Sequence, residues 1–222
     1  MTARNYGQYC GVVSALELVG ERWALLIVRD LLVGPRRYTD LKAGLPRIPT
    51  NILSTRLKEL QEGGVIRRAP LLRSIVYELT DFGRGLEDVV LALSRWGFQA
   101  MGAPEPGDIV TDDSMTIDFR TAFRADAGSS EPATTYLVHV GDDVHLALRV
   151  SGGRLTVLPQ HLSSTPPDLE FATSPDIRFV VSGELAPAEA IATGTVRVLD
   201  GNPALLERFA STFSLAPQAV PF

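Results

Sequence analysis

The stretch from residue 34 to residue 80 constrains the fold most strongly, because helical and extended patterns follow one another there in a short space. Pro46 and Pro49 separate two helical segments, since proline removes a backbone donor and restricts the residue before it. Thr50 or Asn51 can cap the second segment with a side-chain oxygen. The pattern therefore predicts a short helix, a turn and a longer helix that begins near residue 50.

The longer helix has one apolar face and one polar face. On a wheel of about 100° per residue, Leu53, Leu57 and Leu60 lie within about 40° of one another, which predicts contact with a core. The opposite face carries Asn51, Thr55, Lys58 and Glu62. Short polar side chains near a helix N-terminus suit a helix whose first turns enter the major groove of DNA and reach base edges.

Two extended runs, residues 65–68 and 74–79, follow Gly63 and Gly64. They are joined by a turn that contains Pro70 and Arg73. A hairpin placed directly after a recognition helix is a wing, and its arginines are placed to meet phosphate. The order helix, turn, helix and ribbon is typical of a winged DNA-binding module.

Four fragments carry a family resemblance, and they are ALELVGERWALLIVRDLL, GPRRYTDL, LSTRLKELQEGGVI and YELTDFG. In order and spacing they resemble the HxlR-type winged helix-turn-helix, a relative of MarR-type transcriptional regulators, over about residues 10–100. The resemblance implies a dimeric DNA-binding module. It also implies that the N-terminal helix and the helix expected from Thr80 or Asp81 to about Trp96 form the dimer interface, and such a two-fold dimer would match an inverted repeat.

Cys10 is the single cysteine, which excludes an internal disulfide. It is interpreted most simply as a small, partly buried residue before the first helix. Some HxlR-type proteins use a cysteine near this position for redox sensing, which would need an accessible thiol of low pKa. That family usually has proline after the cysteine, whereas this chain has Gly11.

The candidate DNA contacts fall into two groups. We predict base-edge contacts from Asn51, Ser54, Thr55 and Lys58. We predict phosphate contacts from Thr50, Arg36, Arg37, Tyr38, Arg67, Arg68 and Arg73. Arg56 lies beside the apolar stripe of the helix, so it could form a structural salt bridge instead of a contact with DNA.

Charge is divided unequally along the chain. Residues 1–102 carry a net charge of +4 and residues 103–222 carry −9, so only the first part has a polarity suited to nucleic acid. We expect three segments: a winged helix-turn-helix DNA-binding and dimerisation domain over 1–102, a linker over 103–110, and a second domain over 111–222. The expected fold class is α+β.

The second domain is expected to contain an antiparallel meander with covering helices. Around the turn at residues 141–143, Val140 should face Val144, Val138 should face Leu146 and Tyr136 should face Leu148, which makes one face of the hairpin apolar. A second turn at 151–153 leads to a third strand. Residues 176–182 fit either a strand or a short helix.

Residues 174–215 are similar to the C-terminal half of sterol carrier protein type 2-like domains. The resemblance implies a sheet covered by helices around an apolar cavity, and hence a small apolar ligand. A packed core or a dimerisation domain is the plainer alternative.

Enzyme, metal and membrane functions find little support. His139 and His145 should face each other across the hairpin, but two histidines do not complete a metal site, and Asp142 and Asp143 lie in the turn. No serine lies in a nucleophile motif, and the sequence contains no glycine-rich phosphate-binding loop. No cofactor is indicated. No apolar run approaches the ~20 residues that span a bilayer, so a cytoplasmic protein is expected.

These observations predict a cytoplasmic, homodimeric transcriptional regulator that binds double-stranded DNA at an inverted repeat. A small apolar ligand in the C-terminal domain could control it. The alternative is a lipid or small-molecule carrier that uses the winged domain only for dimerisation, although the cluster of basic residues argues against it.

Overall fold

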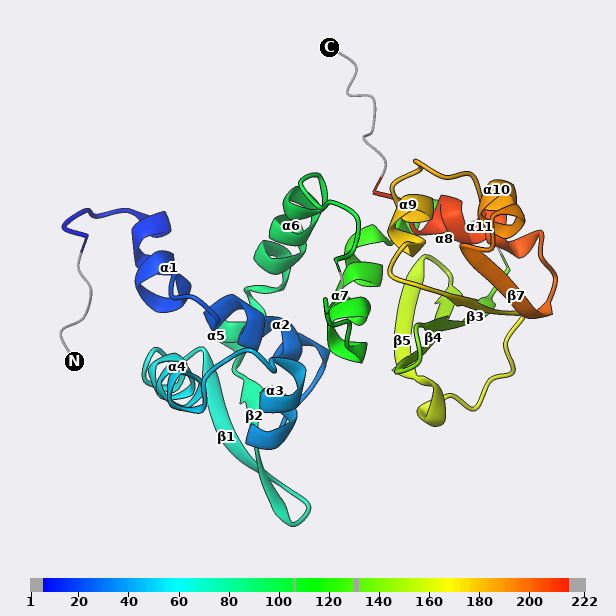
Figure 1. Ribbon diagram of the computed structural model, residues 1–222. Helices are drawn as coiled ribbons and strands as arrows, with labels where there is room; N and C mark the ends of the chain where they lie inside the picture. The colour runs from blue at the N-terminus through cyan, green and yellow to red at the C-terminus, as the bar shows by residue number, and fades with distance from the viewer. Residues whose placement is uncertain (1–5, 106, 130–131, 216–222) are drawn as a thin grey trace. The chain divides into compact units, whose positions relative to one another are not determined.

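The computed structural model describes residues 6–105, 107–129 and 132–215. The chain divides into two compact units between Ala92 and Leu93, inside a helix (Figure 1). The domain assignment with a linker at 103–110 remains a prediction. The fold class is α+β, as expected: a winged helix-turn-helix is followed by a unit built on a β-sheet.

The first unit holds a helical group, a hairpin and a return to helix. Its elements are α1 (Gly11–Val19), α2 (Ala24–Val33), α3 (Tyr38–Gly44), α4 (Thr50–Glu62), β1 (Ile66–Leu71), β2 (Ser74–Leu79), α5 (Asp81–Arg84) and the start of α6 (Glu87–Phe98).

The predicted apolar face of α4 is its buried face. Leu53, Leu57 and Leu60 are each at most 2% exposed. The wing is the antiparallel hairpin β1–β2, in which Ile66 lies opposite Leu79. Pro70 belongs to β1 rather than to the turn, which consists of Leu72 and Arg73.

Two predicted helix boundaries were wrong in detail. The cap position of α4 is taken by Pro49 in extended conformation without a side-chain cap bond, so Thr50 is the first helical residue and not the cap. The helix expected from 80 to 96 is divided into α5 and α6. Thr80 does cap α5 by accepting a hydrogen bond from the Gly83 N–H at 3.0 Å. The wing packs closely there, because a Cβ on Gly83 would lie 2.0 Å from the Val65 carbonyl oxygen.

The second unit alternates helices with five strands. Besides the end of α6, its elements are α7 (Asp112–Ala122), α8 (Ala125–Ser129), β3 (Thr134–Val140), β4 (Val144–Ser151), β5 (Arg154–Pro159), the 3-10 turn η1 (Gln160–Leu162), β6 (Leu169–Thr173), α9 (Ile177–Val181), α10 (Pro187–Ala192), β7 (Val196–Gly201) and α11 (Leu205–Thr212).

The five strands form one sheet in the order β5-β4-β3-β6-β7. The meander β3–β4–β5 is confirmed, with the predicted pairs Val140–Val144, Val138–Leu146 and Tyr136–Leu148. The parallel pairing of β6 with β3 was not predicted. The segment over 176–182 is helical and contains α9.

The core of the second unit is aromatic. Phe119 from α7 and Phe209 from α11 meet edge to face with ring centroids 6.1 Å apart. Phe209 also packs on Tyr136 of β3 and Phe171 of β6, at 5.3 and 5.2 Å. Aromatic side chains therefore fill the layer between the helices and the sheet. The resemblance of this unit to sterol carrier protein type 2-like domains remains a prediction. Among the described residues, no helix has the length and apolarity needed to cross a bilayer.

Candidate nucleic-acid interface

The N-terminus of α4 is fixed to α3 through Tyr38. The Tyr38 hydroxyl donates to the Thr50 carbonyl oxygen at 3.0 Å, and the Ser54 hydroxyl donates to the same oxygen at 3.0 Å. The start of α3 is fixed in turn by Asp40, which accepts the Arg37 N–H at 2.9 Å. These hydrogen bonds fix α3 and α4 relative to each other, as a helix-turn-helix requires.

The outer face of α4 presents the polar side chains that were predicted to read bases. Asn51, Ser54 and Lys58 are exposed, and Thr55 is half-buried. The Thr55 hydroxyl donates to the Asn51 carbonyl oxygen at 2.9 Å. Lys58 Nζ lies 3.7 Å from Glu62 Oε1, but both side chains are about two-thirds exposed, at 67% and 64%. Such an exposed pair is weak, so Lys58 can leave it for another anion.

The three wing arginines lie in different surroundings. Arg67 Nε donates to Glu78 Oε1 across the hairpin at 2.7 Å, so its charge is already balanced. The Arg68 guanidinium lies over the Tyr77 ring, 6.0 Å from its centroid. Arg73 is exposed in the turn at the tip. The tip arginine and Arg68 are therefore better placed for a phosphate than Arg67.

The segment before α3 joins the wing through its backbone. The Arg36 N–H donates to the Tyr77 carbonyl oxygen at 3.0 Å, and the Tyr77 N–H donates to the Arg36 carbonyl oxygen at 2.7 Å. Arg36 is half-buried and its guanidinium donates to the Pro35 carbonyl oxygen, whereas Arg37 is exposed. This bridge brings the Arg36–Arg37 pair beside the base of the wing.

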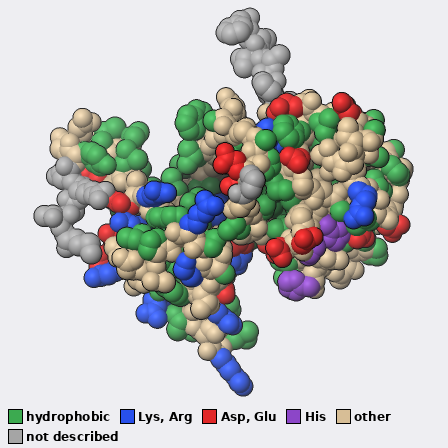
Figure 2. Space-filling view, viewed as in Figure 1, with side chains coloured by type: hydrophobic (Ala, Val, Ile, Leu, Met, Phe, Trp, Pro, Cys, Tyr) green, Lys and Arg blue, Asp and Glu red, His purple; other side chains and the backbone are tan. Residues whose placement is uncertain are grey.

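A shallow groove connects these elements. It has a volume of 340 Å³ and is lined by Tyr38, Ser54, Leu57, Lys58, Gln61, Glu62, Arg68 and Tyr77. Four predicted contact residues share this groove, although they come from α3, α4 and β1. Figure 2 shows Lys and Arg side chains over the first unit as far as the hairpin tip. The groove thus brings four of the predicted residues together, and we call the exposed polar face of α4, this groove and the exposed arginines of the hairpin the α4–wing surface.

Two exposed residues of this region were not predicted. Arg47 lies in the turn between α3 and α4, and Gln61 lines the groove one turn after Lys58. The position of Arg47 between Pro46 and Pro49 was a usable signal, because a basic residue before a helix N-terminus is a good phosphate position. Arg56 forms ion pairs with Glu21, at 3.2 Å, and with Glu59, which confirms its structural alternative.

Cys10 is exposed, so its interpretation as a partly buried residue was wrong. It occupies the cap position of α1. The backbone N–H groups of Val13, and secondarily of Val12, favour the thiolate and lower the pKa of the thiol below its ordinary value. An accessible thiol at a helix N-terminus has two of the properties that a redox sensor needs.

Two helices expose apolar side chains. On α1, Val12 and Leu16 are exposed, and on α6, Val89, Leu93 and Trp96 are exposed, with Trp96 at 69%. Large apolar side chains gathered on one helix face are typical of an interaction surface.

The histidine pair of the second unit is confirmed in register. His139 Nδ1 lies 2.7 Å from His145 Nδ1, and His139 Nε2 lies 2.9 Å from Glu170 Oε1. In the part of the chain that the structure describes, no group of three or more histidine, cysteine or acidic side chains is arranged to hold a metal ion.

Comparison with known proteins identifies relatives of the first unit. Residues 18–104 match the model of the HxlR-like helix-turn-helix family. The HTH-type transcriptional regulator YodB of Bacillus subtilis is 34% identical over 103 residues, which cover 45% of this chain and 89% of YodB. YvaP of the same organism, also named an HTH-type transcriptional regulator, is 38% identical over 37% of this chain and 79% of its own length. The HTH-type regulator Rv3095 of Mycobacterium tuberculosis is 43% identical over 41% of this chain and 59% of its own length.

Solved structures give matches of the same extent. The reduced form of YodB from B. subtilis is 33% identical and covers 46% of this chain and 100% of its own, with a TM-score of 0.37. The quinone-bound form covers 39% and 93%, with 34% identity and a TM-score of 0.35. The second unit lies largely outside the residues matched by the family model.

Proposed function

Since the chain belongs to the HxlR-like helix-turn-helix transcriptional regulators, we propose that it binds an inverted-repeat DNA site as a cytoplasmic homodimer through its α4–wing surface. Its relatives are regulators of transcription and not enzymes. The observation that carries the proposal is the division of α4 into a buried leucine face and an exposed polar face that begins at its N-terminus.

Base reading is assigned to the exposed face of α4. Asn51 carries an amide that can bond adenine in two places, and Lys58 can reach guanine acceptors. The Ser54 and Thr55 hydroxyls donate to helix carbonyls in the free protein, and their oxygens keep acceptor capacity for cytosine or adenine amino groups. Each good contact of this kind is worth about 1–3 kcal/mol of discrimination.

Phosphate binding is assigned to the rim of the same surface. Arg73, Arg68 and Arg37 are exposed and supply charge without a prior cost of breaking an ion pair inside the wing. Arg67 would have to exchange Glu78 for phosphate, so its contribution is the smallest of the wing arginines. Tyr38, Thr50 and Arg36 act mainly by holding α4 and the wing in place.

Dimerisation is assigned to the exposed apolar faces of α1 and α6. Burial of side chains such as Leu16, Leu93 and Trp96 gives the hydrophobic driving force that a permanent dimer needs. Sedimentation equilibrium of the full chain tests this assignment. Trp96→Glu should shift the protein to monomer, whereas Leu162→Glu, at a similarly exposed apolar site in η1, should leave the dimer intact.

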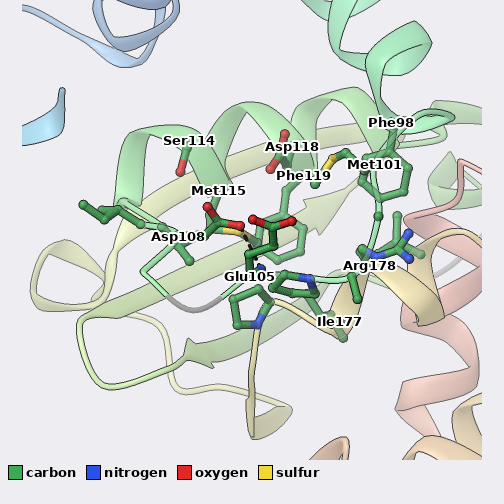
Figure 3. A pocket seen from close by; sticks show the side chains of 17 residues that line it. Phe98, Met101, Glu105, Asp108, Ser114, Met115, Asp118, Phe119, Ile177 and Arg178 are labelled. Carbon is green, nitrogen blue, oxygen red and sulfur yellow. Dashed lines mark hydrogen bonds between the residues drawn. The ribbon is translucent and has the colours of Figure 1, made fainter. Parts of the chain in front are cut away.

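Control by a small apolar ligand is assigned to the second unit, and a redox response to Cys10. The second unit contains a cavity with an apolar lining (Figure 3), and the cysteine is exposed with a lowered pKa. With these assignments, ligand binding or oxidation of the thiol would change the affinity of the same chain for its DNA site.

Capture of genomic DNA fragments by the purified full chain tests the DNA-binding proposal. We expect the enriched fragments to share a short inverted repeat, with half-sites about one helical turn apart. Enrichment that follows fragment length alone, at every salt concentration, would reduce the protein to a non-specific binder and contradict the proposal.

A further inference from the structure

The end of the wing is apolar, although hairpin turns are ordinarily built from glycine and short polar residues. Val76, at 3% exposed, is the last buried side chain before the turn. Beyond it, Leu71 and Ile75 are 49% and 48% exposed, and Leu72 in the turn is 95% exposed. The hairpin therefore carries its apolar side chains at the end that is most open to a partner.

Leu72 also has an unfavourable backbone conformation. Its φ is +54°, in the left-handed region, and it forms a two-residue turn with Arg73 between the paired residues Leu71 and Ser74. Glycine and asparagine adopt this conformation readily, whereas the Cβ of leucine crowds the following carbonyl group. Residues held in such conformations are concentrated at functional sites. The strain and the exposure together indicate that the side chain of Leu72 contacts a partner.

The charges of the hairpin favour a nucleic acid as that partner. Arg68 and Arg73 are exposed, and Glu78, the single acidic residue of β1 and β2, is already paired with Arg67 at 2.7 Å. Arg68 also lines the same groove as Lys58 of α4. The apolar end of the wing is thus continuous with the α4–wing surface, which is assigned to DNA.

The wing is long enough to reach a second groove of the DNA. Each strand of the hairpin has six residues, which at about 3.3 Å per residue gives a length of about 20 Å. The major groove of DNA is about 12 Å wide, and the minor groove is about 6 Å wide. With α4 in the major groove, the hairpin can pass the bordering phosphates, and its narrow two-residue turn fits the adjoining minor groove.

We propose that Leu72 is an apolar wedge that enters the minor groove beside each half-site and partly unstacks one base step. This inference rests on the function proposed above and names a residue that determines specificity without hydrogen bonds to bases. Leucine is among the side chains that proteins insert between base steps. Pyrimidine–purine steps are the easiest to unstack, so the wedge favours such a step at its position.

A fluorescent base tests the wedge. 2-Aminopurine, whose fluorescence rises when stacking is lost, is placed at successive positions beside each half-site of the best captured fragment. Saturation with the full chain should give a several-fold rise at one step in each half-site. Leu72→Asn and Leu72→Gly, which suit a positive φ, should remove the rise, whereas Leu72→Met should keep it. An undiminished rise in Leu72→Asn, or no rise in the bound unmodified chain, would overturn the proposal.

The sequence of the unstacked step provides a second measurement. Replacement of a pyrimidine–purine step by AA at this position should lower the affinity of the unmodified chain by about three- to tenfold, because the stiffer step resists unstacking. Leu72→Asn should lose much less. Leu162→Asn, at an exposed apolar site in η1, should respond as the unmodified chain does. An equal loss in Leu72→Asn and the unmodified chain would mean that another residue reads the step.

The outcomes separate this inference from the proposed function. Leu72→Asn should not lower the melting temperature, because the side chain is exposed and asparagine accepts the left-handed conformation. If the full chain selects an inverted repeat but unstacks no step, the wedge fails alone and base reading by α4 stands. If capture finds no shared site, the proposed function fails and the wedge fails with it.

Discussion

The two units of the chain differ in where their distinctive side chains lie: on the outer surface in the first unit and in the interior in the second. In the first unit, aliphatic side chains fill the core and the distinctive residues lie on the outside of α4 and of the wing. In the second unit, the distinctive residues are inside, where Phe119, Phe209 and Phe213 pack on the sheet. The first unit therefore offers an outer surface to a large partner, and the second offers an interior to a small one.

Substitutions in the two cores should have the largest effects on stability, and they test whether the two units differ as described. Leu57→Ala and Phe209→Ala each leave a cavity in a buried core and should cost about 2–5 kcal/mol of unfolding free energy. Leu57→Ala should also abolish specific DNA binding, because α4 loses its anchor. Phe209→Ala should retain it.

Hydrogen exchange of the full chain distinguishes the two variants. In Phe209→Ala, protection should fall in the strands of the second unit and persist in α4. Loss of protection throughout the chain in both variants would mean that the units fold as one cooperative body, and the contrast between them would not hold for stability.

A substitution at the tip of the wing tests whether the outer surface of the first unit contacts DNA phosphate. Arg73→Ala should weaken binding to all sequences alike and flatten the salt dependence by about one unit of slope, as expected for one phosphate contact. Arg154→Ala, an exposed arginine at the start of β5, should change neither quantity. A loss confined to the best fragment would assign Arg73 to base reading instead.

The difference between the units also explains what could be predicted from sequence. The helix-turn-helix and the wing depend on local patterns: the leucine spacing of α4, Pro46 and Pro49 between the helices, and Gly63 and Gly64 at the end. The β3–β4 register followed from alternation around a short turn. Each of these signals lies within a few residues of the feature that it predicts.

The parts that escaped prediction depend on contacts between distant residues. The parallel pairing of β3 with β6 joins Tyr136 to Leu169, and no turn between them fixes the register. The pairing of Arg67 with Glu78 and the placement of Arg68 over Tyr77 required the hairpin register and the rotamers. The cavity depends on packing among α7, α9 and the chain after α6, which no local pattern encodes.

Cys10 provides a prediction of chemical reactivity. Because the backbone N–H groups at the start of α1 lower the pKa of the thiol, its thiolate should be present at lower pH than that of an ordinary cysteine. Alkylation by iodoacetamide near neutral pH should be several-fold faster than for free cysteine, and the advantage should vanish at pH values above the ordinary thiol pKa.

A redox role for Cys10 requires a second result. Mild peroxide should change the DNA affinity of the full chain and leave that of Cys10→Ser unchanged. Equal responses of the two proteins, or none in either, would remove Cys10 from the account of regulation.

The smallest effect, a small change in melting temperature, is expected from a substitution at Asp112, the first residue of α7. Burial, and secondarily the charge of Asp113, raises the pKa of its carboxyl above its ordinary value. The folded chain thus holds this proton more tightly than the unfolded chain, and stability falls as pH rises from the ordinary pKa through the raised one. Asp112→Asn should therefore raise the melting temperature slightly at neutral pH and leave it unchanged in acid. A lower melting temperature at neutral pH would contradict this sign.

The most direct test of the central claim is one titration series on the best captured fragment. Asn51→Ala and Lys58→Ala should each cost about 1–3 kcal/mol of binding free energy on that fragment and much less on unrelated DNA. Arg154→Ala serves as the matched control for loss of a positive charge. If both α4 variants bind the fragment as tightly as the unmodified chain, the outer face of α4 does not read the DNA, and the assignment of the α4–wing surface is wrong.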